Sequence, residues 1–558
     1  MVDTSAVEVV DWHEEFDVVV VGSGAAGYAA ALTAAANGAK VAVLDAAASV
    51  GGTTAKSGGT TWIPSNHMME LQGLQDDPQA AMAYIARYGF PSEYRADDPH
   101  FGLAEEDFAL IKRFCEAGRE AIDFLVDLGA LKFQQRLRPD GTPFPPYPDY
   151  QSHLPESRGI IGRSMSPGLP PGIELPPDLL AEHRLLPGGL IMIESMRVKG
   201  DELGVAVRLN HRVVDVVADA GGRVRGVVAR SGRDTRLIGA RSGVVFGSGG
   251  FLMNRDLSDE YLKGAVIGGC SAETNTGDFV TIAGRVGARF GHMSQAWWTQ
   301  TVLELSLRVP SALEAVWYPF GDSMIQVNKY GRRVTNEKQV YNERGQVHFA
   351  YDPHRIEFPN ALLFQVYDSA VADNPLVWPY RGMTPMPGEQ SAYVVSGETL
   401  QDLADAISKQ LNDLRDSIGD VELAPDFVEI LGASIARFNE FARVGIDDDF
   451  HRGDNPIQVL ANGPGRTDSP NPTMAPFRET GPYYCIIMAA GAIDTKGGPR
   501  IDTEARVLDV VNQPIPGLFG AGNCIASPFG QAYPGAGASI GAALTFGYLA
   551  GRSAATAT

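Results

Sequence analysis

The stretch "FDVVVVGSGAAGYAAALTAAANGAKVAVLD", Phe16 to Asp45, decides the fold. A short apolar run, Asp17 to Val21, predicts a buried β-strand, and the alanine-rich segment after it predicts a helix to about Asn37. A second apolar run, ending at Asp45, predicts a second strand. Between the first strand and the helix stands Gly-Ser-Gly-Ala-Ala-Gly, the turn of a βαβ unit that binds dinucleotides.

Three glycines of this turn have separate physical roles. Gly22 permits the tight turn, Gly24 lets a pyrophosphate approach the backbone, and Gly27 allows the helix to pack closely on the strand. Asp45 lies 23 residues after Gly22, where a carboxylate binds a ribose hydroxyl. The sequence therefore predicts a Rossmann-type nucleotide-binding domain.

Composition narrows the class of protein. The 558 residues are enough for more than one domain, and Lys+Arg of 46 against Asp+Glu of 67 gives a net charge of -21. Such a charge disfavours nucleic acid or an anionic membrane surface as partner and favours a small-molecule ligand. The acidic N-terminus lacks a secretion signal, and no apolar run reaches the roughly 18 residues that span a bilayer. We expect a cytoplasmic protein with no integral membrane segment.

The four cysteines stand far apart with no CxxC pair, and the ten histidines show no metal-ligand spacing. We therefore expect no metal and no redox dithiol, which excludes a pyridine-nucleotide disulfide reductase. The cysteines are interpreted as buried small hydrophobic residues.

The chain changes character twice. Short β-like runs from Val205 to Phe251 give way after about Cys270 to mixed strands and loops, and then to amphipathic helices at Thr399 to Gln410 and Phe427 to Arg443. Strands return near Tyr483. We predict an α/β fold in which a discontinuous Rossmann-type FAD-binding domain is interrupted by an inserted α+β catalytic (cap) domain. The predicted boundaries are 1–268 and 478–558 for the FAD-binding domain and 269–477 for the insert.

The choice of FAD over NAD comes from the C-terminal segment. A strand, a Gly-Ala-Gly-Asn turn at Gly520 to Asn523 and a small-residue helix follow one another there. Because ligands bind at the carboxyl ends of strands in a doubly wound sheet, a cofactor as long as FAD can be held by both ends of the chain.

A run from Val510 to Gly551 has no Asp, Glu, Lys, Arg or His, and it contains "FGQAYPGAGAS". The amides of Gly537, Ala538 and Ser539 fall at a predicted helix N-terminus without intrahelical partners, and the Tyr533 hydroxyl supplies another donor. Neutral donors in a water-poor pocket suit a ketone that becomes an enolate. A cation there would over-stabilise a carboxylate, and a carboxylate would repel the enolate. The alternative is a helix that only packs against flavin, with a core tyrosine.

The sequence resembles the fumarate-reductase-like flavoproteins and, within them, the 3-ketosteroid dehydrogenases. The matching stretches are "VVVVGSGAAG", "GGTTAKSGGTTWIP", "NTGDFVTIAGRVGA", "SQAWW", "VNKYGRRVTNE", "GIDDDFHRGD", "GLFGAGN" and "YPGAGASIGAALTFGYLAG". "GTTAKSGGTTWIP" and "YPGAGASIG" are the most specific of these. The resemblance covers both ends and most of the middle of the chain.

The resemblance implies bound FAD and a substrate carbonyl held by Tyr533 and Gly537. Together with the glycine motifs, it leads us to expect these cofactor-binding residues: Gly22, Gly24, Ala25, Ala26, Gly27, Asp45, Gly52, Thr53, Thr54, Ser57, Gly58, Gly59, Val214, Gly249, Gly522, Asn523, Ala538, Ser539 and Ile540.

In the family, a tyrosine a few residues after an Asn-Glu pair removes the α proton. Tyr341, five residues after Asn336, matches that position, although an ordinary buried tyrosine is the alternative. Because an unperturbed tyrosine has a pKa of about 10, it needs donors or positive charge nearby to act as a base. Its charged sequence neighbours are Arg332, Arg333, Lys338 and Arg344.

Two features depart from the family. A second tyrosine usually supports the base, but in "YPDYQSHLPE" Tyr150 aligns with the first tyrosine of the family's pair and Gln151 with the second, which is the one that counts. Either Tyr150 takes the role or proton removal is arranged differently. The long helical insertion that steroid-active relatives carry after "GRSMSP" (Gly162 to Pro167) is also missing, which would suit a smaller ketone.

The leading hypothesis is FAD-dependent α,β-dehydrogenation of a cyclic ketone, with a 3-ketosteroid (Δ1 type) as leading substrate and oxygen or a quinone as electron acceptor. A smaller ketone of the cyclohexanone or 4-oxocyclohexanecarboxylate type is the alternative. A dicarboxylate enzyme of the fumarate-reductase type needs His and Arg near the C-terminal turn, and Val510 to Gly551 has neither. The remaining alternative is a flavin- or nucleotide-binding protein without chemistry.

Overall fold

We describe the protein from a computed structural model that covers residues 11–137, 141–175, 187–312, 315–376, 381–463 and 469–557. The chain divides into two compact units. Unit 1 comprises the described residues up to Tyr261, Ser271–Ala296 and those from Asp494 onward. Unit 2 comprises Leu262–Cys270 and the described residues of Trp297–Ile493. Residues 1–10, part of the acidic N-terminus that we expect to lack a secretion signal, lie outside the described residues. Residues 176–186, part of the stretch after Pro167 where the long insertion is missing, also lie outside them.

Unit 2 overlaps most of the predicted insert at 269–477, but the boundaries differ. Residues 271–296 belong to unit 1 because the amide of Ala272 and the side chain of Asn275 donate to Thr53 Oγ1. Residues 478–493 belong to unit 2 because most of β16 (Tyr483–Thr495) pairs with β14 (Leu362–Asp368).

The core of unit 1 is an eight-stranded sheet with the order β18-β19-β9-β1-β2-β6, in which β8 also pairs with β9 and β7 pairs with β8. The predicted βαβ unit is confirmed as β1 (Glu14–Val21), α1 (Ala25–Ala36) and β2 (Val41–Leu44), with β1 and β2 parallel. β9 (Asp234–Phe246) lies parallel to β1 on its other side. The remaining strands are β6 (Ala206–Arg208), β7 (Arg212–Ala218), β8 (Val224–Ser231), β18 (Arg506–Leu508) and β19 (Pro514–Gly520).

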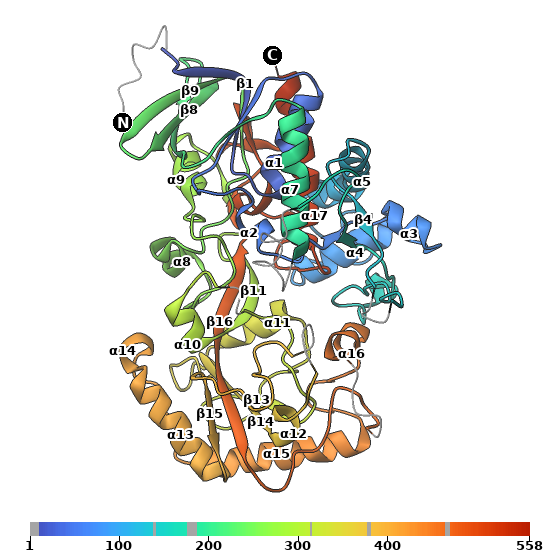
Figure 1. Cartoon of the computed structure of the whole chain (residues 1–558), viewed down its shortest axis with the longest axis vertical. Coiled ribbons are helices and arrows are strands. Elements are labelled where there is room, and N and C mark those ends of the chain that lie inside the picture. Colours follow the sequence, from blue (N-terminus) through green and yellow to red (C-terminus); the bar gives the residue numbers. More distant parts are fainter. Residues whose placement is uncertain are drawn as a thin grey trace. The chain divides into compact units, whose positions relative to one another are not determined.

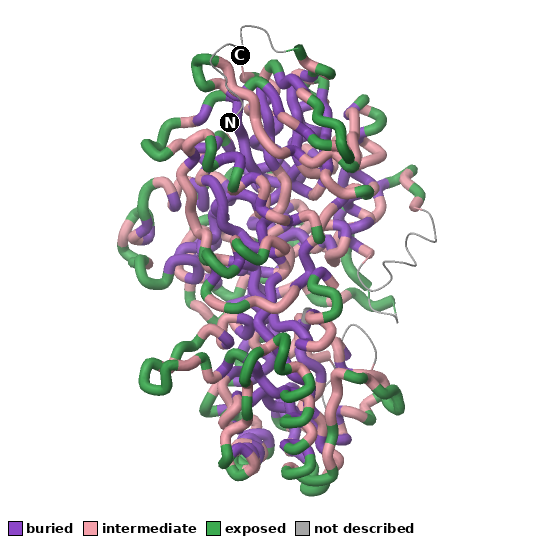
Figure 2. Tube along the Cα trace, turned by 90° about the vertical axis from the view of Figure 1, so that its left-hand side faces the viewer, coloured by how far each residue is buried: buried purple, intermediate pink, exposed green. Residues whose placement is uncertain are grey.

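The C-terminal helix α17 (Ala538–Thr556) packs along α1 (Figure 1). Glycines permit this close approach, because a Cβ at Gly547 or Gly551 would lie 2.5 Å from Ala26 O or 2.3 Å from Ala30 O. Most residues of α17 are buried, and buried segments run through the interior in Figure 2. The uncharged C-terminal run therefore has a packing reason as well as a chemical one.

The other helices and strands of unit 1 surround this sheet. The predicted glycine-rich loop at Gly51 to Gly59 contains one helical turn, α2 (Gly52–Ala55), which starts after a left-handed Gly51 (φ 106°). The remaining elements are β3 (Thr61–Trp62), α3 (His67–Leu71), α4 (Pro78–Gly89), α5 (Glu105–Asp127), β4 (Phe133–Gln134), η1 (Pro155–Ser157), β5 (Ser164–Pro167), α7 (Pro187–Glu202), α8 (Arg255–Tyr261), α9 (Asp278–Arg285), β10 (Phe290–Gly291), β17 (Gly498–Pro499) and η3 (Gly522–Cys524).

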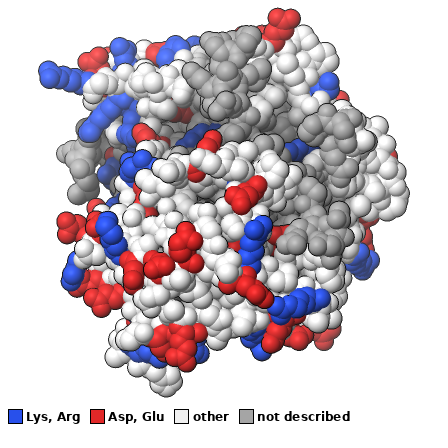
Figure 3. Space-filling model, turned by 60° about the horizontal axis from the view of Figure 1, so that its bottom comes forward, with Lys and Arg blue, Asp and Glu red and all other residues white. Residues whose placement is uncertain are grey.

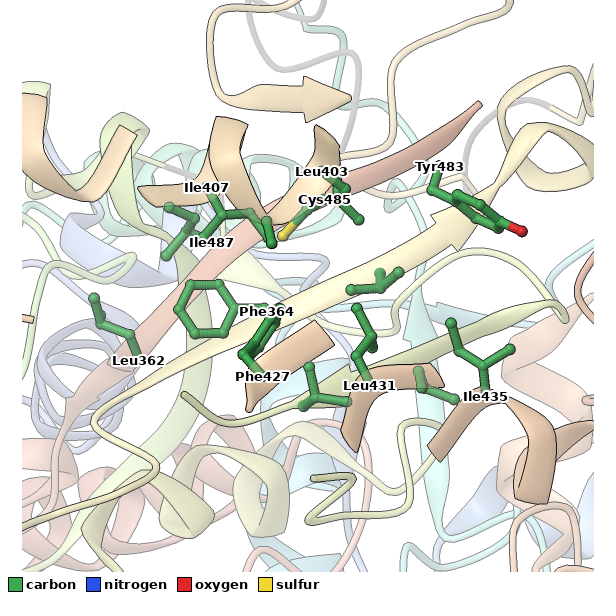
Figure 4. Close-up of a cluster of buried hydrophobic side chains, with 14 of the residues drawn as sticks. Leu362, Phe364, Leu403, Ile407, Phe427, Leu431, Ile435, Tyr483, Cys485 and Ile487 are labelled. Atoms are coloured by element: carbon green, nitrogen blue, oxygen red, sulfur yellow. The ribbon is translucent and has the colours of Figure 1, made fainter. Parts of the chain in front are cut away.

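Unit 2 is built on a six-stranded sheet with the order β12-β11-β16-β14-β13, and β15 pairs with β16. The two predicted amphipathic helices are confirmed as α13 (Leu400–Asp413) and α15 (Phe427–Val444). Their apolar side chains, including Ile407 and Leu431, pack with Phe364 of β14 in one buried cluster (Figure 4). The other elements are β11 (Ala296–Val302), α10 (Leu303–Arg308), β12 (Ala315–Val316), β13 (Met324–Val327), α11 (Tyr341–Gln346), η2 (Val347–Phe349), α12 (Ser369–Ala372), β15 (Val394–Gly397), α14 (Arg415–Ile418) and α16 (Pro456–Asn462).

Surface and cysteine chemistry agree with the composition. Acidic and basic side chains are interspersed on the face drawn in Figure 3 rather than gathered into one basic patch. All four cysteines are buried and none of them forms a disulfide, in agreement with their interpretation as small hydrophobic residues. Among the helices that the structure describes, we find none with both the length and the apolar character to cross a bilayer.

Candidate active site

The first glycine turn is bare backbone, as predicted. Gly22 has a φ of +98°, and a Cβ there would lie 2.5 Å from Gly247 O. A Cβ on Gly27 would lie 1.9 Å from Gly22 O, so only glycine allows α1 to pack this closely on β1. At Gly24 the protein leaves room for a Cβ, with Thr54 Oγ1 nearest at 3.6 Å. None of the described residues therefore demands a glycine at Gly24, whereas a pyrophosphate against the start of α1 would demand it.

The second glycine-rich loop folds against the start of α1. Thr54 Oγ1 accepts the amide proton of Ala25 at 3.2 Å, and Ser57 Oγ donates to Thr54 O at 2.7 Å. The amide of Gly59 donates to Ser57 Oγ at 3.1 Å. The loop is thus tied to the predicted pyrophosphate site, next to residues Gly52, Thr53 and Gly58 of the same prediction.

Asp45 is buried at the end of β2. Its Oδ2 accepts the amide proton of Ser23 at 2.8 Å and the Ser23 hydroxyl proton at 2.6 Å, and its Oδ1 accepts the amide proton of Ala47 at 2.8 Å. Ser23 Oγ in turn accepts the amide proton of Gly51 at 3.0 Å. Asp45 therefore joins the two glycine-rich turns, and its contact with a ribose stays a prediction.

Asp494 is a functional candidate that the sequence analysis missed. Its Oδ2 accepts from the amide of Gly250 at 3.0 Å, from Asn275 Nδ2 at 2.7 Å and from Asn523 Nδ2 at 3.1 Å. Asn275 Nδ2 also donates to Thr53 Oγ1 at 3.1 Å. Asp494 therefore connects three predicted cofactor-binding segments, since Gly249 directly precedes Gly250. The only signal in the sequence was an aspartate inside the apolar strand "YYCIIMAAGAIDT".

We expect Asp494 to make the stability of the protein depend on pH. Burial raises the pKa of Asp494 from its ordinary 3.8 to about 6, so folding favours the protonated form. This contribution is fully present below about pH 4 and is lost as the pH rises through about 6, a change of about 3 kcal/mol in the free energy of unfolding. The difference between wild type and Asp494→Asn in urea unfolding should change over this range. Asp97→Asn, at an exposed aspartate, should show no such change, and a constant difference for Asp494→Asn would contradict the expectation.

The structure also places three other residues that we predicted to bind the cofactor. Val214 lies in β7 at an irregularity between Val213 and Asp215, and its carbonyl accepts from Arg285 at 3.3 Å. Gly522 has a φ of +77°, and a Cβ there would lie 2.9 Å from Ala26 Cβ. Ile540 lies in the first turn of α17. Their contacts with FAD stay predictions.

The C-terminal turn brings two of the predicted catalytic tyrosines together. The rings of Tyr150 and Tyr533 lie 5.4 Å apart at 67°, an edge-to-face arrangement. The amide of Tyr150 donates to Pro534 O at 2.9 Å, which fixes the 147–156 segment against the turn. Both tyrosines are buried.

Gly537 and Gly535 are required by their surroundings. Gly537 has a φ of +88°, and a Cβ there would lie 1.9 Å from Thr60 O. A Cβ on Gly535 would lie 2.4 Å from Trp62 Cδ1. The indole N–H of Trp62 donates to Asp149 Oδ1 at 2.8 Å, next to Tyr150. The bare backbone of the turn therefore packs directly on β3.

One detail of the predicted donor set is wrong. The amide of Ala538 donates to Gly535 O at 3.1 Å, because the turn before α17 closes on itself. For the amides of Gly537 and Ser539 we find no hydrogen-bond partner among the described residues. The helix start thus offers two backbone donors, where the sequence predicted three.

The prediction that charge is kept away from this turn is also wrong. Lys496, which is buried, donates from Nζ to Ala532 O at 2.8 Å, directly before Tyr533. The absence of charged residues from 510–551 describes that segment alone and does not show which side chains pack on it. Lys496 comes from a distant part of the sequence, so only the fold shows the contact.

Gln151, which replaces the expected second tyrosine, contacts tyrosines of α4. Its amide donates to Tyr84 Oη at 3.0 Å, and its Nε2 donates to Tyr88 Oη at 3.4 Å. Tyr84 Oη donates to Pro534 O at 2.8 Å. Neither tyrosine was predicted as a site residue. The available signal was their spacing of four residues, which places both side chains on the same face of a helix.

Tyr341 belongs to unit 2, where it is the first residue of α11 and is buried. Its ring meets Trp317 edge to face at 5.1 Å and Tyr318 at 6.0 Å. Of its charged sequence neighbours, Arg333 pairs with Glu337 at 2.8 Å and Arg332 is exposed. Lys338 and Arg344 are buried.

Comparisons with known proteins identify the family of the chain. The family model described as "FAD binding domain" matches residues 17–540. The chain is 31% identical to 4-oxocyclohexanecarboxylate 2-dehydrogenase of Sinomonas cyclohexanicum, over 97% of this chain and 93% of the relative. It is also 31% identical to 3-oxosteroid 1-dehydrogenase of Mycolicibacterium smegmatis, over 96% of both chains.

A solved structure agrees with the fold over the whole chain. 3-Ketosteroid delta1-dehydrogenase from Sterolibacterium denitrificans, in complex with 1,4-androstadiene-3,17-dione, superposes with a TM-score of 0.79 at 26% identity. The alignment covers 98% of this chain and 100% of that one. The predicted α/β flavoprotein fold, the resemblance to the 3-ketosteroid dehydrogenases and FAD as cofactor are confirmed.

The residues present fit FAD. The turn at Gly22 to Gly27 leaves bare backbone and room at Gly24 for a pyrophosphate, and the segments joined by Asp494 bring both ends of unit 1 to this region. The chain therefore belongs to the FAD binding domain family and is an FAD-dependent oxidoreductase.

Proposed function

We propose that the protein removes two hydrogens from adjacent carbons of a cyclic ketone, introducing a double bond conjugated with the carbonyl. The observation that carries this proposal is the C-terminal turn, where a tyrosine and backbone amides stand together on bare, buried backbone. Such neutral donors suit a carbonyl oxygen that gains negative charge. The ketone dehydrogenases to which the chain is similar support the same reaction class.

The proposed roles follow from the donors. The Tyr533 hydroxyl and the Gly537 amide donate to the carbonyl oxygen and stabilise the negative charge that develops when the α carbon loses its proton. Tyr341 takes that proton on its phenol oxygen, and Tyr150 supports the base. When bound, FAD would supply the two-electron acceptor for the β hydrogen and its electron pair, which leaves the ketone oxidised. Oxygen or a quinone would be the final electron acceptor.

FAD would be held by the two glycine-rich turns and the C-terminal turn. Besides Gly22, Gly24 and Gly27, we propose contacts from Ala25, Ala26, Asp45, Gly52, Thr53, Thr54, Ser57, Gly58, Gly59, Val214, Gly249, Gly522, Asn523, Ala538, Ser539 and Ile540.

A 3-ketosteroid, oxidised in the Δ1 manner, is the leading substrate, and a smaller ketone such as a 4-oxocyclohexanecarboxylate is the second. The first is supported by the likeness to a structure that holds a steroid dienone. The second is supported by the equal identity to a 4-oxocyclohexanecarboxylate dehydrogenase and by the short sequence after Pro167.

Anaerobic titration of the FAD-loaded protein with a panel of ketones tests the proposal. We expect the visible flavin absorbance to bleach with a 3-ketosteroid, and a conjugated enone to form in equal amount. Bleaching by cyclohexanones but not by androstenedione would replace the steroid with the second substrate class. Bleaching by no ketone, together with rapid reoxidation of chemically reduced protein by fumarate, would overturn the proposed reaction.

A further inference from the structure

The segment 316–319 of unit 2 is held by two buried cations. Arg344 donates from its guanidinium to Val316 O at 2.9 Å and to Trp317 O at 2.5 Å. Lys338 donates from Nζ to Pro319 O at 2.5 Å. The two cations stand three residues after and three residues before Tyr341. We call Lys338 and Arg344 the cation pair.

The segment held in this way is the one that packs on Tyr341. The Trp317 ring meets the Tyr341 ring edge to face at 5.1 Å and 83°, and the Tyr318 ring meets it at 6.0 Å and 75°. Because carbonyls on both sides of these aromatic residues are bound to the cation pair, the pair fixes the backbone that carries the two rings. The cation pair therefore helps to hold the aromatic residues that pack on the Tyr341 ring.

The cation pair is bound to neutral acceptors. The other contacts of Arg344 are Gln339 O at 2.8 Å and Gln300 Oε1 at 2.5 Å. Within the part of the chain that the structure describes, no carboxylate lies within ion-pair distance of Lys338 or Arg344. Burial lowers the pKa of Arg344 to about 9 and that of Lys338 well below its ordinary value. Two buried basic side chains without a paired carboxylate cost stability, and such groups are typical of functional sites.

The remaining charges near the cation pair are largely compensated. Glu337 is buried between Arg333, at 2.8 Å, and Arg452, at 3.1 Å. His348, which reaches Arg344 through Gln300, is neutral at ordinary pH because burial lowers its pKa to about 4. The other titratable groups that interact with the pair are Tyr318, Asp322 and Glu343.

We propose that Lys338 and Arg344 are positioning residues for Tyr341: both hold Trp317 and Tyr318 against its ring, and the Arg344 guanidinium supplies positive charge that favours its ionised form. This inference rests on the proposed function, in which Tyr341 removes a proton. A phenol becomes negative when it has lost its own proton and is ready to accept another, and a nearby cation stabilises that state. Among the described residues, no carboxylate forms an ion pair with Arg344 and so competes for its charge.

The test uses Arg344→Met and Lys338→Met in the FAD-loaded protein, with Arg332→Met as the matched control. Arg332 belongs to the same segment but is exposed, so its loss removes the same charge without touching 316–319. We expect both of the first two variants to slow bleaching about tenfold at neutral pH, and Arg344→Met also to raise the pH midpoint of ketone-driven flavin bleaching by about one unit. Arg332→Met should leave both unchanged.

A second readout does not depend on turnover. The near-ultraviolet absorbance of tyrosinate is titrated in wild type and in Tyr341→Phe, and their difference reports the ionisation of Tyr341. This difference should move to higher pH in Arg344→Met, and Arg344→Lys should restore most of it because the charge is kept. Should Arg344→Met fail to fold, Lys338→Met and Arg344→Lys decide the question.

The results distinguish the proposed role of Tyr341 as base from the proposed role of the cation pair. If Tyr341→Phe bleaches its flavin as fast as wild type, the proposed base is wrong. If Tyr341→Phe is slow but both methionine variants keep the wild-type rate and Arg344→Met keeps the wild-type pH midpoint and tyrosinate titration, the role of the cation pair alone is overturned.

Discussion

Replacing Tyr341 by phenylalanine is expected to slow reduction of the flavin by ketone about 10²- to 10⁴-fold, the usual contribution of a general base. The phenol oxygen is lost, whereas the ring contacts with Trp317 and Tyr318 can persist. Binding of the ketone should change little because no donor to its carbonyl is removed. Anaerobic stopped-flow measurement of flavin bleaching gives the rate and the ketone concentration dependence separately.

Tyr330→Phe is the control for this experiment. Tyr330 lies in the same "VNKYGRRVTNE" stretch, and its hydroxyl contacts Glu357. Its loss should leave bleaching unchanged. If Tyr341→Phe retains the wild-type rate and Tyr150→Phe does not, Tyr150 and not Tyr341 is the base.

Tyr533→Phe is expected to lower the rate of flavin reduction about 10²- to 10³-fold, the cost of one donor to a developing oxyanion. The ring should stay packed on Tyr150, and FAD should stay bound, because the change removes only the hydroxyl. The pH midpoint of bleaching should not move, in contrast to Arg344→Met. Stopped-flow bleaching across pH distinguishes the two variants.

The matched control is Tyr548→Phe, also on the C-terminal segment. The Tyr548 hydroxyl donates to Glu120 at 2.8 Å and takes no part in the proposed site. A wild-type rate in Tyr533→Phe would remove the oxyanion role from the C-terminal turn and leave that turn as a packing element for the flavin.

Local sequence was enough to predict the nucleotide-binding unit. The β1-α1-β2 order, the tight turn at Gly22 and the close packing at Gly27 depend on neighbours within one short stretch, where strand, helix and glycine preferences agree. The start of α17 after Gly537 was predictable for the same reason. The amide of Ala538 was not, because turn closure onto Gly535 depends on the detailed backbone path.

The sequence by itself determined the cofactor fold and the start of the C-terminal helix after Gly537, since each is written in contiguous residues, and its resemblance to a known family made Tyr341 the candidate base. Only the tertiary structure decided what surrounds them. Asp494 meets Gly250 across 244 positions of sequence, and Lys496 meets Ala532 across 36. The cation pair reaches segment 316–319 across 19 to 28 positions. Such contacts depend on how distant segments pack, and side-chain periodicity within one segment carries no information about them.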